Sequence, residues 1–127
     1  MQTNSTLCRH LKERLNKDHK DKIYPELLRS MDDSSDQVRT ATVECISAFL
    51  QCLEKEGDIA CFKSLFSGLA VHMDDAEESM QRSVCKCFIK AASFDSQIVK
   101  EIMLENVEKH RTPHYCTEVL NYINDTS

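Results

Sequence analysis

Cysteine is the residue type that first invites a metal or redox role for this chain, since 7 cysteines are present. The closest pair, Cys85 and Cys87, falls on a predicted helix, where residues two apart point about 200° apart and cannot share one tetrahedral zinc ion. Four cysteines fall on apolar stripes of predicted helices, where cysteine packs as a small hydrophobe: Cys45, Cys52, Cys87 and Cys116. We therefore expect core thiols, with a cysteine-based metal or redox protein as an alternative.

Histidine offers a second possible metal site. His110 and His114 are four residues apart with Cys116 close by, a spacing that could bind a metal ion on one continuous helix. Between the two histidines, however, Thr112-Pro113 predicts a helix start, because threonine suits the N-cap and proline suits the first helical position. A helix boundary there spoils the geometry, so we predict no metal site.

Paired carboxylates occur at Asp32-Asp33 and at Asp74-Asp75, where they could act as catalytic acids or calcium ligands. A calcium site of the EF-hand type needs a 12-residue loop that contains glycine, and the sequence has no such loop. It also lacks a glycine-rich phosphate loop and a recognisable nucleophile motif. We expect these aspartates to cap the helices that follow them, in a chain without enzymatic activity or cofactors.

Composition limits the fold classes and cellular compartments that we expect for this chain. Glycine and proline number only 2 each, which favours long helices over turn-rich β-structure. The net charge is −5 and residues 32–78 are strongly acidic, which argues against nucleic-acid binding. Residues 9–22 are basic and form either a contact for an acidic partner or a solvated helix face. With a polar start and no apolar run near ~18 residues, we expect a cytoplasmic protein that does not bind membranes.

Hydrophobic periodicity predicts seven helices. On the third, two apolar stripes leave one narrow polar line, so we expect this helix to be covered on two sides. Its first stripe runs from Val38 through Ala41, Cys45 and Phe49 to Cys52. The helices are expected at about 5–17, 22–31, 36–54, 58–73, 77–93 and 96–109, with the last starting at Thr112-Pro113.

An internal repeat sets the predicted architecture. A shift of 42 residues aligns Met31-Asp32-Asp33 with Met73-Asp74-Asp75, and it also pairs Cys45 with Cys87. Helix pairs of that length are the units of HEAT and armadillo proteins. We predict an all-α fold, an α-α superhelix or HEAT/armadillo-like solenoid, forming a single domain over residues 1–127. Its parts would be a leading helix at 1–21, repeats at 22–54 and 58–93, and a terminal cap hairpin at 96–124.

The first of these repeats resembles a HEAT repeat in detail. The family's proline, turn aspartate and Val-Arg pair match at Pro25, Asp33, Val38 and Arg39. The resemblance implies that the arginine reaches a turn carboxylate in a ladder along the stack. The second repeat keeps Asp75 but has Ser67, Met80 and Gln81 where proline, valine and arginine would stand.

A closer resemblance is to the C-terminal repeats of the HEAT-repeat dynein axonemal assembly factors. It is carried by Ile23–Asp33, by Leu69–Asp75 and by residues 109–116, within a region of similarity over about 20–124. The resemblance implies a cytoplasmic scaffold that preassembles dynein arms for motile cilia, with dynein intermediate or heavy chains and assembly chaperones as partners. A generic HEAT-repeat adaptor in transport or phosphatase regulation is the alternative.

A polar line on the third and fifth helices is the candidate binding feature. Because the second helix of each HEAT unit lines the concave side, we expect two adjacent stripes about 10 Å apart, one neutral-to-acidic and one basic. The alternative is an ordinary solvated face with a Glu44–Lys86 contact. The candidate partner-binding residues are Gln37, Thr40, Glu44, Gln51, Arg82, Lys86 and Lys90.

The N-terminal end of the predicted solenoid has no capping repeat. Leu7, Leu11 and Leu15 form one apolar stripe on the first helix. We therefore expect either self-association through this end or marginal stability of the isolated chain.

Overall fold

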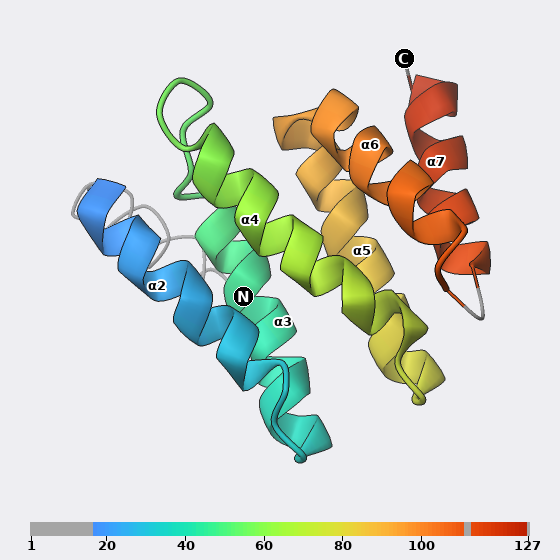
Figure 1. The fold of residues 1–127 in the computed structure, drawn as a ribbon, viewed down its shortest axis with the longest axis horizontal. Helices are drawn as coiled ribbons and strands as arrows, with labels where there is room; N and C mark the ends of the chain where they lie inside the picture. Colours follow the sequence, from blue (N-terminus) through green and yellow to red (C-terminus); the bar gives the residue numbers. More distant parts are fainter. Residues whose placement is uncertain (1–16, 111–112, 127) are drawn as a thin grey trace, which may run out of the picture. The chain divides into compact units, whose positions relative to one another are not determined.

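The computed structural model of the chain describes residues 17–110 and 113–126, which contain six α-helices, one 3₁₀-helix and no strand (Figure 1). The predicted all-α, HEAT-like fold class is confirmed. The helix predicted at 5–17, with its apolar stripe and the proposed self-association surface, lies almost entirely outside the described residues. None of the helices in the described part of the chain is long and apolar enough to cross a membrane.

The chain divides into two compact units, and the boundary between them falls inside helix α4, between Leu65 and Phe66. The described part of the first unit contains α2 (Lys17–Ser30), α3 (Asp36–Leu50) and the beginning of α4 (Ile59–Leu69). The second unit contains the end of α4, the 3₁₀-helix η1 (Ala70–Asp74), α5 (Glu78–Phe94), α6 (Ser96–Val107) and α7 (His114–Thr126). The predicted repeat boundaries stay a prediction.

In the first unit, α2 and α3 form a helical hairpin (Figure 1). Helix α2 already includes Lys17, although its predicted start is residue 22, and it continues through Pro25. Helix α3 begins after Ser35, whose hydroxyl accepts a hydrogen bond from the Val38 N–H at 3.4 Å and so caps the helix. It ends at Leu50, before the predicted 54, and backbone bonds to the third residue back continue as far as Leu53.

The predicted burial of α3 on two sides is wrong for its first half. The second apolar stripe is buried throughout at Val43, Ile46, Leu50 and Leu53. On the first stripe only Phe49 and Cys52 are buried, whereas Val38 is 40% exposed and Ala41 and Cys45 are also exposed. Cys45 is therefore a surface thiol rather than the predicted core residue, because the first half of this stripe faces solvent.

In the second unit, the apolar face of α5 is buried as predicted. Met80, Val84, Cys87, Phe88 and Ala91 are each at most 3% exposed. The ring of Phe88 meets that of Phe66 edge to face, with 5.2 Å between centroids and planes at 76°. This geometry suits the quadrupoles of two aromatic rings and anchors the end of α4 on α5.

Helices α6 and α7 form the last hairpin of the second unit and pack against α5 (Figure 1). The side chain of Asp95 caps α6 by accepting a hydrogen bond from the Ile98 N–H at 3.0 Å. Helix α7 begins at His114, directly after Pro113, and contributes Cys116, Val119 and Ile123 to the core.

Candidate functional site

The two acidic turns aligned by the 42-residue shift have the same local structure. An Asp33 carboxylate oxygen accepts a hydrogen bond from the Ser35 N–H at 2.8 Å. An Asp75 carboxylate oxygen accepts one from the Glu77 N–H at 2.9 Å. Each aspartate therefore folds the turn onto its own backbone two residues ahead. The prediction that these residues cap the following helices is wrong, since Ser35 and Glu77 occupy the N-cap positions.

The residues after the turns differ between the units. Arg39 forms an ion pair with Asp36, one turn back on α3. Gln81, its counterpart under the repeat shift, is 8% exposed and donates a side-chain hydrogen bond to the Asp75 carbonyl oxygen. Met80 is 3% exposed, although its counterpart Val38 is 40% exposed. The arginine ladder implied by the HEAT resemblance stays a prediction for Arg39. In the second unit, the neutral amide of Gln81 bonds to the turn instead.

The neutral-to-acidic stripe predicted on the third helix lies on α3. The side chains of Gln37, Thr40 and Glu44 are exposed on this helix. Together with Asp36 and Ala41 they line a shallow, open depression of about 340 Å³. Gln51 is also exposed and is the C-cap residue, so it lies just past the end of the helix. Three of the four residues predicted on this stripe therefore share one concave surface that offers amide, hydroxyl and carboxylate groups.

The basic stripe predicted on the fifth helix lies on α5, where Arg82, Lys86 and Lys90 are all exposed. The Arg82 guanidinium lies 3.4 Å from a carboxylate oxygen of Glu78. The Tyr115 hydroxyl, from α7, donates a hydrogen bond to the same oxygen at 3.3 Å. Contact with Tyr115 and the charge of Glu78 raise the pKa of Arg82. The first cation of the stripe thus contacts Glu78 of its own helix, and Glu78 in turn contacts Tyr115 of α7 in the same unit.

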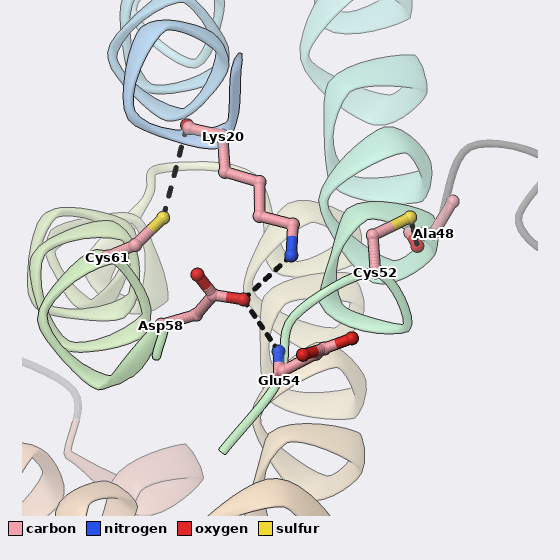
Figure 2. Close-up of polar contacts among 6 residues, drawn as sticks. All are labelled: Lys20, Ala48, Cys52, Glu54, Asp58 and Cys61. Atoms are coloured by element: carbon pink, nitrogen blue, oxygen red, sulfur yellow. Dashed lines mark hydrogen bonds and ion pairs between the residues drawn. The ribbon is translucent and has the colours of Figure 1, made fainter. Parts of the chain in front are cut away.

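Lys20 and Asp58 form a buried ion pair that the sequence analysis does not predict (Figure 2). The Lys20 ammonium lies 2.8 Å from an Asp58 carboxylate oxygen, and the two side chains are only 6% and 4% exposed. The Glu54 N–H donates a hydrogen bond to the same oxygen at 2.7 Å. Residues 9–22 were expected to form a solvated or partner-binding basic face, and for Lys20 that expectation is wrong.

The sequence did contain a signal for this burial. Lys20 stands at helical spacing with Tyr24, Leu27 and Met31, so it belongs to the apolar stripe of α2 rather than to its polar side. A charge at such a position needs a buried partner, because desolvating an ion without one costs several kcal/mol. Asp58, at the start of α4, supplies that partner from a site 38 residues away.

Burial suppresses the reactivity of several thiols. Desolvation raises the pKa of Cys61 to about 11, with smaller contributions from Asp21 and Asp58. Desolvation likewise raises the pKa of Cys85 to about 12 and that of Cys116 to about 11. Because the thiolate is the nucleophile and the metal ligand, these groups are unreactive near neutral pH.

The structure brings together two of the three residues considered for a metal site. The Cys116 sulfur lies 3.5 Å from Nδ1 of His110. His114 is exposed, and its ring lies against that of Tyr115 with 4.1 Å between centroids. Within residues 17–110 and 113–126, no group of three or more histidine, cysteine or carboxylate side chains could hold a metal ion.

Comparison with known proteins matches this chain to a repeat family and to curated relatives. A model of the HEAT repeat matches residues 23–53. Dynein axonemal assembly factor 5 of Xenopus laevis is 34% identical over 117 residues, which cover 86% of this chain and 14% of that protein. The Mus musculus and Homo sapiens proteins of the same name are 30% and 31% identical, each over 80% of this chain and 12% of their own length. No solved structure matches the chain.

This chain thus spans only a small part of the length of the curated relatives that it matches. The matched HEAT repeat contains the second half of α2, the turn at Asp33 and all of α3. The chain therefore carries a HEAT repeat at residues 23–53 and resembles dynein axonemal assembly factors along most of its length.

Proposed function

We propose that this chain is a non-catalytic, protein-binding scaffold in the cytoplasmic preassembly of axonemal dynein arms for motile cilia. Its partners would be dynein intermediate or heavy chains and assembly chaperones. The observation that carries the proposal is the similarity to proteins named dynein axonemal assembly factor 5, which extends over 80–86% of this chain.

The chemistry of the described residues supports binding rather than catalysis. Buried thiols with a raised pKa are poor nucleophiles. The exposed polar groups on α3 and α5 are amides, hydroxyls and single charges, which suit reversible recognition of another protein surface. A HEAT repeat is in addition an architecture whose helical surfaces serve as extended binding faces.

We assign partner binding to two faces, each within its own unit. The first is the α3 face, with Gln37, Thr40 and Glu44 around the depression and Gln51 beyond the helix end. The second is the α5 face, defined by Arg82, Lys86 and Lys90.

The function is tested by affinity capture of the tagged chain from an extract of ciliated cells. Recovery of a dynein chain or an assembly chaperone is the expected result. Recovery of transport or phosphatase subunits in their place would overturn the dynein assignment and indicate a generic HEAT-repeat adaptor.

The α3 face is tested in the same capture with Thr40→Lys plus Glu44→Lys. A matched control is Glu118→Lys plus Asn121→Lys, which makes the same charge change at two exposed positions of α7. We expect the first variant to lose the captured partner and the control to keep it. Equal capture by both variants would exclude the α3 face as a binding site.

A further inference from the structure

Three cations of α5 form one row. Arg82, Lys86 and Lys90 follow one another at intervals of four residues. Each interval advances about 6 Å along a helix axis, so the row extends about 12 Å. The buried side of α5, which includes Val84 and Phe88, lies on the opposite face of the helix. We call Arg82, Lys86 and Lys90 the α5 cationic row.

The charges of this row are only partly balanced within the protein. Arg82 pairs with Glu78, at 3.4 Å. Across the described part of the chain, no carboxylate lies within ion-pair distance of Lys86 or Lys90. By contrast, Lys20 pairs with Asp58, and Arg29 pairs with Glu26 at 2.7 Å. Like charges four residues apart on a helix repel one another, so the row gains by meeting negative charge from outside.

One end of the row also has contacts within its own unit. Glu78 holds the Arg82 guanidinium, and the Tyr115 hydroxyl from α7 in turn holds Glu78. The Arg82 side chain is 61% exposed, so it stays accessible to a partner carboxylate. Lys86 and Lys90 then extend the charge along the helix on flexible stems that adjust to a partner.

We propose that the α5 cationic row docks an acidic helical segment of a partner protein, whose carboxylates recur at every fourth residue. A helix lying alongside α5 has the same axial rise, so its first, fifth and ninth side chains meet all three cations together. One exposed ion pair contributes little, but three in register add, and they also select the orientation of the partner. This inference rests on the proposed function, because it names the chemistry of the partner that one of the two faces would bind.

The test uses synthetic helical peptides and the full chain. The first probe is an alanine-based peptide with three glutamates spaced four residues apart. The second has the same composition, with the glutamates distributed around the helix. Fluorescence anisotropy at low salt should show several-fold tighter binding of the first probe, and raising the salt concentration should weaken it. Equal binding of both probes would contradict the proposal that the partner's carboxylates must recur at every fourth residue.

Variants of the chain then locate the contact. Lys86→Glu plus Lys90→Glu should bind the first probe roughly tenfold more weakly, because two attractive contacts become repulsive. Lys55→Glu plus Lys63→Glu is the matched control, since both lysines are exposed and the net charge changes equally. A milder pair, Lys86→Gln plus Lys90→Gln, serves if the reversed pair loses its helical circular dichroism.

Two outcomes would overturn the assignment to α5. One is wild-type affinity in the folded Lys86/Lys90 variant, and the other is an equal loss in the Lys55/Lys63 control. Affinity capture with the same variants separates this inference from the proposed function. Unchanged binding of the first probe by the folded Lys86/Lys90 variant rejects the row and leaves the scaffold function standing. Failure of the wild-type chain to recover any dynein chain or assembly chaperone rejects the scaffold function itself.

Discussion

The turn at Asp33 and the turn at Asp75 are copies in backbone geometry but not in the polar chemistry that follows them. Each aspartate accepts a hydrogen bond from an N–H two residues later, at 2.8 and 2.9 Å. The next turn of helix then diverges, because Arg39 pairs with a carboxylate whereas Gln81 donates to a carbonyl oxygen. The two repeats thus share the hydrogen bond that forms the turn. In the helix that follows, the first repeat has a charged arginine where the second has a neutral glutamine.

The contrast extends to what holds each unit together. In the first unit, the buried pair of Lys20 and Asp58 fastens α2 to the start of α4. In the second unit, the contacts with α5 are largely apolar, as in the edge-to-face contact of Phe66 with Phe88. A buried ion pair is sensitive to the loss of either member, because the other is left charged and desolvated. An apolar contact lacks this dependence, so the two units should respond differently to mutation.

The largest expected effect is in the first unit. Lys20→Ala should destabilise it by about 3–5 kcal/mol, because the Asp58 carboxylate stays buried without its cation. Lys20→Met plus Asp58→Leu should recover most of the loss, since replacing both ions with apolar groups is often neutral. Urea unfolding followed by circular dichroism measures both variants.

The control for this prediction is Arg29→Ala, which breaks an exposed pair whose side chains are 73% and 65% exposed. Such a pair contributes ~0–1 kcal/mol. If Lys20→Ala cost no more than Arg29→Ala, the buried pair would not be what fastens the first unit.

A smaller effect is expected from alkaline pH, with the second unit the more sensitive. Burial raises the thiol pKa of Cys85 to about 12 and that of Cys116 to about 11 in the second unit, and that of Cys61 to about 11 in the first. Above pH 9.0, the value of an unperturbed thiol, the unfolded chain loses these protons while the folded chain keeps them.

The unfolded state is therefore favoured as the pH rises from 9.0 toward 11–12, and the free energy of unfolding should fall. One pH unit above 9, each thiol should account for roughly 1 kcal/mol. Urea titrations at several pH values check this, and Cys85→Ala should show the shallower slope. A slope unchanged in that variant would mean that the Cys85 thiol does not keep its proton through folding.

The smallest expected change in stability comes from mutating the aspartates of the two turns. Asp33→Ala and Asp75→Ala each remove one hydrogen bond to a backbone N–H, worth about 1 kcal/mol. We expect the loss at Asp75 to be the smaller one, because Gln81 bonds the carbonyl of that residue, which alanine retains. Adding Gln81→Met to Asp75→Ala should then enlarge the loss. Thermal unfolding measures all three, and equal losses in the two single variants would show that Gln81 adds no support to its turn.

The elements of the fold could be predicted from the sequence because they depend on local periodicity. The helix at 77–93 was placed within a residue of α5, and its apolar face is buried as expected. The 42-residue shift identified the aspartates of both turns, and the structure gives them the same bonds. A residue's spacing along a helix fixes the face on which it lies, and spacing is visible in the sequence.

Part of the candidate site could also be predicted. The exposed residues of the α3 and α5 stripes follow from the same periodicity, and all seven partner-binding candidates are exposed. Two features could not be predicted: the depression on α3, and the contacts among Arg82, Glu78 and Tyr115. Both include side chains that lie outside the predicted stripes.

By itself, the sequence determined where the helices run, which face of each is apolar and where the repeat recurs. Only the tertiary structure decided which residue pairs with Lys20, that Cys45 is exposed and that the Gln81 side chain bonds the carbonyl of Asp75. The reason is that helical periodicity is set by neighbours within a few residues, whereas burial depends on what packs against a face. For Lys20 that neighbour is Asp58, 38 residues further along the chain.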